Sequence, residues 1–582
     1  MKSGTKKFLA ALTAVVCLAG SSAAGLLQKS MPAIHLTASA KPYLTDDMVL
    51  KYQVTSDNTI ELTGFSEAAT TDIVLPDTIE GLPVTSIASN AFDKEDNVTS
   101  IVLPDSVTTI KNGAFSTCKS LQSITLPDGV TSIGSSAFAG CSALTTINIP
   151  EGITALEAGV FQGCGSLQTI DIPSTITFIG EEAFSGTAVT AFDIPEGITE
   201  VAANTFANCK GLETVSIPST VTSIGAGAFS GCAALTEATI PDGVTEIGES
   251  AFYGCGLLED LTIPSGVQTI GASAFSGCAQ MKEAVIPDGI TAIEESTFSD
   301  CTSLTSVTLP DGLETIGDNA FYQCSALSAI TFPETLTAIG AKAFMYCSSL
   351  ESISIPAAVQ TMEGSSFGMC EKLANIEMAP DNANYVLVDG VIYNADQTML
   401  LYYPSGKAGT EYVVPDGVKI ICPYAFSANR LASITLPESV KIVEEDAIYD
   451  CENLTDLIVE NPYCRLRGIL WRWRDITIHA HSNSRAAAFA NSYNMNFVSL
   501  GIADVIGDVN GDDVISVSDA VLVLNYYAKK SAGLQPETDS LFENIRLGDI
   551  DQDGAITVED AVSILTYYAR KSANLDPFWD EV

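Results

Sequence analysis

A segment of 23 residues recurs along most of the chain, and it limits the possible folds more than any other feature. The Phe of an Ala-Phe dipeptide, or its equivalent, recurs every 23 residues from Phe92 to Phe367, with one step of 22 between Phe184 and Phe206. A fixed period of this length is typical of a solenoid, in which each unit buries its apolar face against its neighbours. Such an array also accommodates 582 residues, which are too many for one ordinary compact domain.

Each repeat contains two short segments that are expected to be extended. The segment 121–127, LQSITLP, alternates apolar and polar residues like a short strand, and its proline ends the strand because proline cannot donate to the next backbone hydrogen bond. The second segment is V-T-x-I-G, and the x-x-A-F-x-x-C that follows it suits a helical turn. The sequence therefore predicts a β-rich solenoid of parallel strands, with 23-residue repeats and short helical turns.

The whole consensus, I-P-x-x-V-T-x-I-G-x-x-A-F-x-x-C-x-x-L, resembles the BspA-like class of leucine-rich repeats found in bacterial surface proteins. The resemblance covers roughly residues 45–500, and the segments DGVIYN and LLYYP also resemble an insert seen inside this class. It implies the following organisation: an N-terminal cap over 41–75, repeats over 76–380, an insert over 381–414, further repeats over 415–475 and a C-terminal cap over 476–500.

The N-terminus has the features of a secretory signal. Lys2, Lys6 and Lys7 precede an apolar run that extends to Gly20, and small residues follow. We expect a signal peptide over residues 1–24, and a second small-residue site would place the cleavage as late as residue 40. No later segment has about 18 uninterrupted apolar residues, so we expect an exported chain with no membrane insertion.

Cysteines occupy one fixed position of the repeat. Of 15 cysteines, 12 lie three residues after the repeat's Phe or its equivalent. Neighbouring repeats bring such residues about 5 Å apart, so disulfides between neighbours are geometrically possible. Buried thiols are the favoured interpretation, because a position shared by every repeat suits a small apolar core residue, and Thr187 and Asn429 replace it without an orphaned partner.

The composition excludes several functions. With a net charge of −44, the chain lacks the clustered cations expected of proteins that bind nucleic acid or anionic membranes. Its three histidines are His35, His479 and His481, so no repeat has the histidine of a Ser-His-Asp or Cys-His site. The last two could form a two-ligand metal site, although a structural cap is the favoured interpretation. We expect no enzyme.

One enzyme alternative stays open. Glycosidase chemistry needs two carboxylates that face each other across a cleft, and a strand ladder does not provide such a pair. The insert contains the only candidates, which are Asp381, Asp389 and Asp396.

From residue 504 the composition changes, and a different repeat begins. Residues 507–532, GDVNGDDVISVSDAVLVLNYYAKKSA, recur at an offset of 41 as residues 548–573, GDIDQDGAITVEDAVSILTYYARKSA. Each copy places oxygen-bearing side chains at positions 1, 3, 5, 9 and 12 of a twelve-residue loop, with a main-chain carbonyl at position 7, which is a ligand set for calcium. The predicted ligands are Asp508, Asn510, Asp512, Val514, Ser516 and Asp519, then Asp549, Asp551, Asp553, Ala555, Thr557 and Asp560.

The two copies predict two calcium ions. The glycine expected at position 6 is present as Gly554, but Asp513 replaces it in the first copy, which suggests a weaker first site. A helix is expected after each loop, with Ala520, Val521, Leu524 and Ala528 on one face of the first. An EF-hand would also need a helix before the loop, and residues 501–506 are too short to form one.

Paired loop-helix units in the last 80 residues or so resemble a type I dockerin, here over 504–582. The resemblance implies a small all-α domain that binds calcium and docks onto a cohesin module of a cellulosome scaffoldin. The near-identity of the copies suggests that either helix can lead in binding. The family's cohesin-contacting positions correspond to Val517, Ser518, Leu524, Asn525 and Lys529, then Val558, Glu559, Leu565, Thr566 and Arg570. The family's usual Ser-Thr and Lys-Arg pairs are missing there, which leaves the type of cohesin open.

Two features of the repeats could recognise a ligand. Glu237, Asp260 and Glu283 recur at steps of 23 and would stack on an exposed sheet, where like charges repel unless a cation is bound. Trp471 and Trp473 alternate in a short segment, so they would either stack on sugar rings or close the end of the solenoid.

The sequence thus favours a secreted, non-catalytic protein of adhesion or scaffolding. Its repeats would recognise a protein or a surface ligand, and its dockerin would hold it at the bacterial surface through a cellulosome. The alternative is a carbohydrate-binding module that targets the cellulosome to plant polysaccharide.

Overall fold

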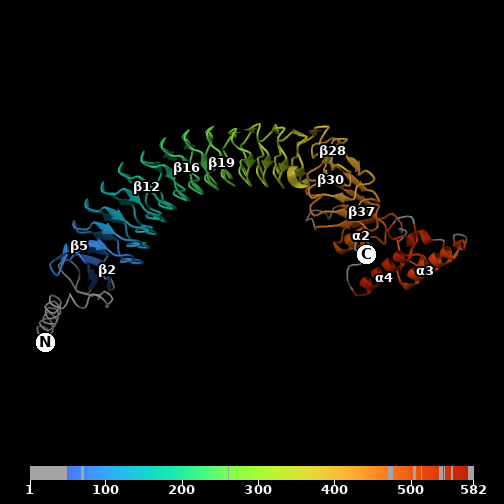
Figure 1. Cartoon of the computed structure of the whole chain (residues 1–582), viewed down its shortest axis with the longest axis horizontal. Coiled ribbons are helices and arrows are strands. Elements are labelled where there is room, and N and C mark those ends of the chain that lie inside the picture. The colour runs from blue at the N-terminus through green and yellow to red at the C-terminus, as the bar shows by residue number, and fades with distance from the viewer. Residues whose placement is uncertain are drawn as a thin grey trace, which may run out of the picture. The chain divides into compact units, whose positions relative to one another are not determined.

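The computed structural model describes residues 49–66, 71–259, 261–468, 476–501, 506–512, 514–536, 542, 544–551 and 555–573. The chain divides into two compact units, Met1–Leu350 and Glu351–Val582, and each is described by itself (Figure 1). Strands dominate the first unit. The second unit contains strands and then helices.

Two ladders of short strands run through the first unit, and most repeats contribute one strand to each ladder. The first ladder contains the strands that precede the prolines: β3 (Asp72–Val74), β6 (Ser100–Val102), β8 (Ser123–Thr125), β10 (Thr146–Ile147), β13 (Ala191–Asp193), β15 (Thr214–Ser216), β17 (Glu237–Ala238), β20 (Glu283–Val285) and β22 (Ser306–Thr308). The second ladder contains the V-T-x-I strands: β5 (Leu82–Ile87), β7 (Thr109–Ile110), β9 (Ser132–Ile133), β11 (Ala155–Leu156), β12 (Phe178–Ile179), β14 (Glu200–Val201), β16 (Ser223–Ile224), β18 (Glu246–Ile247), β19 (Thr269–Ile270), β21 (Ala292–Ile293), β23 (Thr315–Ile316) and β24 (Ala338–Ile339).

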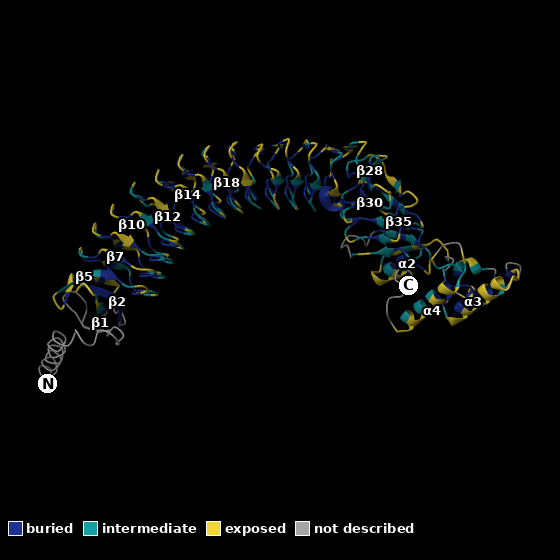
Figure 2. Cartoon of the chain, viewed as in Figure 1, coloured by how far each residue is buried: buried dark blue, intermediate teal, exposed yellow. Residues whose placement is uncertain are grey.

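Pairing between repeats is parallel and one repeat apart, as in Ile101 opposite Ile124 and Ile224 opposite Ile247. The central residue of each first-ladder strand faces inward and its neighbours face outward, so Ile124 is buried while Ser123 and Thr125 are exposed. Figure 2 shows buried residues inside the repeats and exposed residues at the outer turns. The β-rich solenoid predicted from the 23-residue period is confirmed.

The Ala-Phe segment forms a run of hydrogen-bonded turns that stacks on the next repeat. Alternate amides bond across repeats, as from Phe115 N to Ala137 O at 2.8 Å, while those between them bond three residues back within the turn. The Phe rings from Phe92 to Phe344 stack in one column, with neighbouring centroids 5.2–5.8 Å apart. This column is the continuous apolar core that a solenoid needs.

The conserved spacing of the cysteines has a second physical reason beside their size. Eleven of these thiols donate to the carbonyl oxygen of the Phe in the preceding repeat, as in Cys232 Sγ to Phe206 O and Cys255 Sγ to Phe229 O, both at 3.2 Å. All 14 described cysteines are free thiols, and burial raises the pKa of Cys255 to about 12. The thiol therefore donates a hydrogen bond to a buried carbonyl. An aliphatic side chain of the same size could not donate, and that carbonyl would have one hydrogen bond fewer.

The N-terminal strands differ from the repeats that follow. β1 (Val49–Val54) pairs antiparallel with β2 (Ile60–Ser66), which joins the second ladder through β5, and β4 (Thr78–Ile79) pairs antiparallel with β5. Glu61 on β2 is buried and forms an ion pair with Lys111, and it accepts a hydrogen bond from Ser86 at 3.3 Å.

In the second unit the residues predicted as an insert form part of the ladders. After β25 (Ser352–Ile355), β26 (Thr361–Met362), the 3-10 helix η1 (Gly364–Phe367) and β27 (Asn375–Met378), the strands β28 (Tyr385–Val388), β29 (Val391–Asn394) and β30 (Met399–Tyr402) form an antiparallel meander. β30 then pairs parallel with β32 of the next repeat. The insert therefore provides one strand of the second ladder, and β28 and β29 form an additional hairpin before it.

Regular repeats resume after the meander. The first ladder continues with β31 (Glu411–Val413), β33 (Ser433–Leu436), β35 (Asp456–Val459), β37 (Thr477–Ala480) and β38 (Asn496–Ser499). The second continues with β32 (Ile420–Ile421), β34 (Ile442–Val443) and β36 (Arg465–Leu466). Helix α2 (Arg485–Ser492) connects β37 to β38, and Ser484 caps its first turn by accepting from Ala487 N.

The C-terminal part of the second unit is helical. It contains α3 (Val517–Ser531), the 3-10 helix η5 (Ile545–Gly548) and α4 (Val558–Ser572). Its core is small and consists of Val509, Ile515, Ala520, Val523, Ala561 and Ile564. Among the helices of the described residues, none combines the length and apolar character that crossing a bilayer requires.

Candidate calcium-binding loops and binding surfaces

Both C-terminal helices begin with the same reciprocal cap. Ser516 and Thr557 are the N-cap residues, and their side chains accept from Ser518 N and Glu559 N. The third helical residue, Asp519 or Asp560, accepts from the amide of the N-cap residue at 2.8 Å. Each loop therefore passes into its helix through a capping box, which fixes the carboxylate at position 12.

The position-12 carboxylates also hold the start of each loop. Asp519 Oδ1 accepts from the amides of Val509 at 2.9 Å and Asn510 at 3.1 Å, and Asp560 Oδ1 accepts from Ile550 N at 2.7 Å. Asp519 and Asp560 are 0 % and 2 % exposed. Charge is costly at this depth unless it is compensated, so these residues draw the loop amides around a site that favours a cation.

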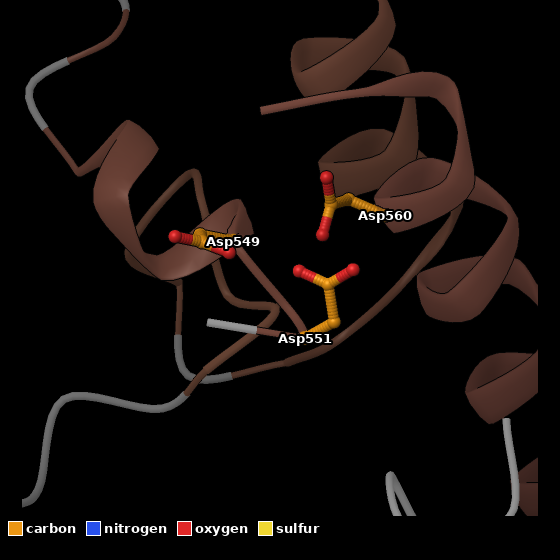
Figure 3. A group of neighbouring side chains, drawn as sticks. All are labelled: Asp549, Asp551 and Asp560. Carbon is orange, nitrogen blue, oxygen red and sulfur yellow. The ribbon is translucent and has the colours of Figure 1, made fainter. Parts of the chain in front are cut away.

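Three carboxylates converge in the second loop. One oxygen from each of Asp549, Asp551 and Asp560 lies within 4.8 Å of the others, and among the described residues this is the one group of its kind. Figure 3 shows Asp551 and Asp560 pointing towards each other, with Asp549 beside them. Three negative charges so close repel one another, and a set made only of carboxylate oxygens is what hard cations prefer. These residues fit calcium.

The first loop is closed by hydrogen bonds of its own side chains. Asp508 Oδ1 accepts from the amides of Gly511 and Asp512 at 2.8 and 3.1 Å, and Asp512 Oδ1 accepts from Val514 N at 2.9 Å. Asn510 donates to Asp512 Oδ2 at 3.0 Å. The side chain of Asn510 is a neutral amide, whereas the second loop has the carboxylate of Asp551 at the same position. The first loop thus has one carboxylate fewer with which to attract a cation.

The remaining predicted ligands are placed as follows. The hydroxyls of Ser516 and Thr557 donate to the position-12 carboxylates at 3.0 Å, in addition to capping their helices. Val514 and Ala555, predicted to contribute carbonyls, are both exposed. Asp553, and the position-6 residues Asp513 and Gly554, lie outside the described residues. The assignment of individual ligands stays a prediction.

The predicted cohesin-contacting residues lie on the outer side of α3 and α4. Val517 and Val558 are 46 % and 44 % exposed, and Leu524 and Leu565 are both 38 % exposed. Large exposed apolar side chains that recur at the same place on two helices are typical of a binding surface. The polar members divide into exposed and half-buried side chains: Ser518, Asn525 and Glu559 are exposed, and Lys529, Thr566 and Arg570 are half-buried.

The apolar face predicted for the first helix is only partly buried. Of its residues, Ala520 is in the core, whereas Val521, Leu524 and Ala528 are exposed. The helix turns Val523 inward instead, and Val521 joins the outer surface together with Val562 of α4. Both faces of this helix are apolar, so the hydrophobic pattern alone could not tell core from contact surface.

One contact distinguishes the two outer surfaces. Lys529 Nζ lies 4.8 Å from the centroid of the Phe542 ring, which also packs edge-on against Tyr526 at 5.5 Å. Phe542 comes from the segment between the two copies, and both of these contacts are with residues of α3. The use of either helix for binding stays a prediction.

The candidate ligand residues of the solenoid are only partly described. Glu237 on β17 and Glu283 on β20 are exposed, whereas Asp260, Trp471 and Trp473 lie outside the described residues, so the surface column stays a prediction. In the insert, Asp389 is in the turn between β28 and β29, Asp396 accepts from the Thr398 hydroxyl at 2.7 Å and Asp381 follows β27.

His479 has a partner on the adjacent strand. Its Nε2 lies 2.6 Å from Asp456 Oδ1, and the hydroxyl of Thr455 lies 2.6 Å from the other oxygen of that carboxylate. The Thr455 hydroxyl, with His479, holds the pKa of Asp456 below its ordinary value. His479 therefore takes part in a side-chain hydrogen bond that links β35 to β37.

Comparison with known families identifies two domains. The family described as BspA type leucine rich repeat region (6 copies) matches residues 85–213, 199–305, 268–387 and 405–502. The family described as dockerin type I domain matches residues 506–568. These two domains are found and no catalytic domain is identified.

Solved structures of bacterial leucine-rich-repeat proteins are similar to the chain. A leucine-rich repeat protein from Bacteroides ovatus is 24 % identical, covers 74 % of this chain and 100 % of its own, and has a TM-score of 0.46. A leucine rich cell surface protein from Faecalibacterium prausnitzii is 30 % identical over 59 % of this chain and 96 % of its own, with a TM-score of 0.41. The search of curated proteins finds no match.

Proposed function

Because the chain belongs to the family of BspA-type leucine-rich-repeat proteins and carries a C-terminal type I dockerin domain, we propose that it is a secreted, non-catalytic binding protein. A dockerin implies binding to a cohesin and hence association with an extracellular cellulosome. In this proposal the solenoid recognises a protein or surface ligand, and the calcium-loaded dockerin docks it onto a cohesin of the scaffoldin.

The convergence of Asp549, Asp551 and Asp560 carries the proposal for the C-terminal domain. Calcium supplies the positive charge that such a group lacks, and its binding holds the loop against the start of α4. The helix ends then present Val517 and Leu524, or Val558 and Leu565, to the partner. Two similar loop-helix units support two calcium ions and two surfaces of similar chemistry.

In this proposal the solenoid binds its ligand through a large exposed surface and has no reactive group. Its first ladder presents one outward side chain or more per repeat, and most of these are short and polar, such as Thr125, Ser216 and Thr308. Such a surface suits an extended partner that makes many weak contacts. The alternative, a carbohydrate-binding module, is supported by the alternation of Trp471 and Trp473 in the sequence.

Cohesin binding tests the first half of the proposal. The full chain is titrated onto a panel of immobilised cohesins in calcium and in a chelator. We expect binding in calcium alone, and its loss in a variant carrying Asp508→Ala with Asp549→Ala. A control with Asp288→Ala and Asp311→Ala removes two carboxylates from the solenoid and should bind normally. Equal binding in the chelator would contradict the proposal.

A depletion assay tests the second half. The full chain, without cohesin, is mixed separately with insoluble plant polysaccharides and with bacterial or host cells, and the protein left in solution is measured. Removal by cells alone supports adhesion. Removal by polysaccharide that is reversed by Trp471→Ala with Trp473→Ala supports the alternative, and no removal by any surface contradicts both.

A further inference from the structure

Two repeats of the first unit have a tyrosine at a position where the earlier repeats have none. In the first seven repeats of the Phe column, the residue directly after the Phe is small or polar. At that position the later repeats have Tyr253 and Tyr322, and the two repeats between them have Ser276 and Ser299. The other repeats show that the fold does not need an aromatic residue here, so these two rings call for a different explanation.

Backbone hydrogen bonds place the two tyrosines in one line. The amide two residues after each Phe donates to the carbonyl oxygen of the residue after the next Phe, as from Asp300 N to Tyr322 O at 2.7 Å. The same bond reaches Tyr253 O from Gly231 N at 2.6 Å. In the repeats that connect the two tyrosines, neighbouring Phe centroids are 5.4–5.7 Å apart and the rings lie within 16° of parallel. Tyr253 and Tyr322 are therefore three such steps apart, with little rotation between the repeats.

The tyrosines are more exposed than the residues between them. Tyr253 is 49 % exposed and Tyr322 is half-buried, whereas Ser276 and Ser299 are each 6 % exposed. The ring of Tyr346 packs edge-on against Tyr322, with centroids 5.5 Å apart and planes at 84°, and so helps to hold Tyr322 in place. Two aromatic rings therefore lie at the ends of a line of short, hydroxyl-bearing side chains.

Polar side chains lie beside this line at a strained backbone position. The residue two after the Phe has a left-handed backbone, and glycine occupies that position in six repeats. Asp300 and Gln323 adopt the same conformation, with φ of 61° and 58°, which costs free energy because the Cβ atom crowds the following carbonyl oxygen. Both side chains are half-buried, and Ser299 donates to Asp300 Oδ2 at 2.9 Å. Polar residues kept where glycine would be unstrained indicate a function for their side chains.

We propose that these residues form a strip, the tyrosine strip, that binds a neutral β-1,4-linked polysaccharide. The tyrosine strip consists of Tyr253, Ser276, Ser299, Asp300, Tyr322 and Gln323. The flat C–H faces of a pyranose ring pack on an aromatic ring, and its hydroxyls pair with the carboxylate of Asp300 and the amide of Gln323. A pyranose unit is about as long as the step between repeats, so an extended chain along the strip meets both tyrosines.

The charge and the periodicity of the solenoid favour this ligand class. A net charge of −44 disfavours an acidic polysaccharide, because the two would repel each other. A protein partner needs apolar contacts at the centre of its interface, and between the two tyrosines the line of the strip has only serine side chains. A surface that repeats at a fixed step suits a polymer that also repeats. The inference rests on the proposed binding role of the solenoid and narrows its surface ligand to one class.

The first test replaces both tyrosines with the residue of the repeats between them. The strip variant has Tyr253→Ser with Tyr322→Ser. The control variant, Phe178→Ser with Tyr493→Ser, removes two aromatic rings that are 50 % and 39 % exposed elsewhere on the solenoid. The probes are cellohexaose, cellobiose and an oligogalacturonate of six sugars, and their binding to the full chain is measured by isothermal titration calorimetry.

We expect the full chain to bind cellohexaose, and to bind cellobiose at least about tenfold more weakly because cellobiose is too short to reach both tyrosines. The affinity of the strip variant for cellohexaose should fall at least about tenfold, and that of the control should stay within about twofold. Equal binding by the strip variant would overturn the proposal, as would equal losses in both variants. Preference for the oligogalacturonate would also overturn it.

The second test separates ligand binding from a structural role at the strained position. A variant with Asp300→Gly and Gln323→Gly has the residue that suits this backbone. Its affinity for cellohexaose should fall about tenfold, while its thermal unfolding temperature should not fall, because strain is relieved. A lower unfolding temperature with unchanged affinity would show that the two side chains are structural and would overturn their place in the strip.

Folding of every variant is checked by circular dichroism and thermal unfolding. If the strip variant fails to fold, Tyr253→Ser and Tyr322→Ser are measured singly, and each should weaken the binding of cellohexaose. Removal of the full chain from solution by cells, without any binding to cellohexaose, would overturn this inference alone and leave the proposed function standing.

Discussion

The solenoid and the C-terminal domain handle buried polar groups in opposite ways. Inside the repeats, a thiol satisfies a backbone carbonyl, as Cys255 does for Phe229, and no charge is involved. Of the four buried carboxylates among the described residues, Asp508, Asp519 and Asp560 lie in the C-terminal domain, and Glu61 in the solenoid is paired with Lys111. The solenoid is thus complete without a ligand, whereas the small domain concentrates negative charge that a cation would balance.

The sizes of the two cores point the same way. A repeat adds a Phe, a Cys and several aliphatic side chains to a column that continues through its neighbours, and each contributes buried apolar area. Among the described residues of the C-terminal domain, the central apolar cluster contains six buried residues. A domain with so small a core usually needs a further source of stability, such as a metal. The comparison therefore predicts that different conditions will unfold the two regions.

Removing calcium should have the largest effect, and on one region only. With a chelator, the thermal transition of the C-terminal domain should be lost or shift far down, because calcium at a thousandfold excess over its Kd contributes about 4 kcal/mol for each ion. Calorimetry of the full chain should show the solenoid transition unchanged. If both transitions are unchanged, or both shift together, calcium does not stabilise the C-terminal domain selectively.

Alkaline pH should act on the opposite region. Burial raises the pKa of Cys164, Cys255 and Cys301 to about 12, from an ordinary value of 9.0. Since the folded state keeps these protons, the associated stability is present below pH 9.0 and is lost as the pH rises towards 12. No cysteine follows Cys464, so the C-terminal domain lacks this dependence.

The measurement is urea unfolding of the full chain at several pH values. The solenoid's free energy of unfolding should fall steeply above pH 9.0, by up to a few kcal/mol for each buried thiol. A variant with Cys255→Ala should be less stable at neutral pH but lose less on alkalinisation. A pH dependence equally steep in that variant and in the natural chain would exclude the thiols as its cause.

Truncating one ring of the Phe column should have a smaller, local effect. Phe229→Ala should lower the solenoid's free energy of unfolding by about 3–5 kcal/mol, because the ring is fully buried between Phe206 and Phe252. The matched control is Tyr253→Ala, an exposed ring in the next repeat, with an expected change within about 0.5 kcal/mol. Denaturant unfolding measures both. Equal costs would mean that the column is not the core of the solenoid.

The solenoid could be predicted because its 23-residue units share one spacing of apolar residues, proline and glycine. The position of Ile124, inward between two exposed neighbours, follows from alternation alone. The role of the thiols did not follow, since the acceptor of each cysteine is a carbonyl 26 residues earlier, on another repeat. The sequence of the segment 381–414 lacks the period, and the structure has there an antiparallel meander whose last strand, β30, pairs parallel with β32; that pairing did not follow from the sequence pattern.

The candidate site was predictable to a lesser degree. The spacing of acidic residues identified the loops, and Asp549, Asp551 and Asp560 do converge. Pattern could not decide which apolar face of α3 is buried, because Val521 and Val523 are alike in chemistry and their places depend on α4. The contact of Lys529 with Phe542 was equally hidden, since it depends on the path of the segment between the copies.

The smallest predicted effect separates capping from metal binding at position 9. Thr557 caps α4 and donates to Asp560 Oδ2, so Thr557→Ala should lower the free energy of unfolding of the C-terminal domain by about 1 kcal/mol even at saturating calcium. Thr557→Ser keeps the hydroxyl and should restore it. Calorimetry gives the stability and a calcium titration gives the affinity. If the alanine variant instead loses calcium affinity and regains full stability in excess calcium, the Thr557 hydroxyl is a calcium ligand. Its hydrogen bond at the helix N-terminus would then make no separate contribution to the free energy of unfolding.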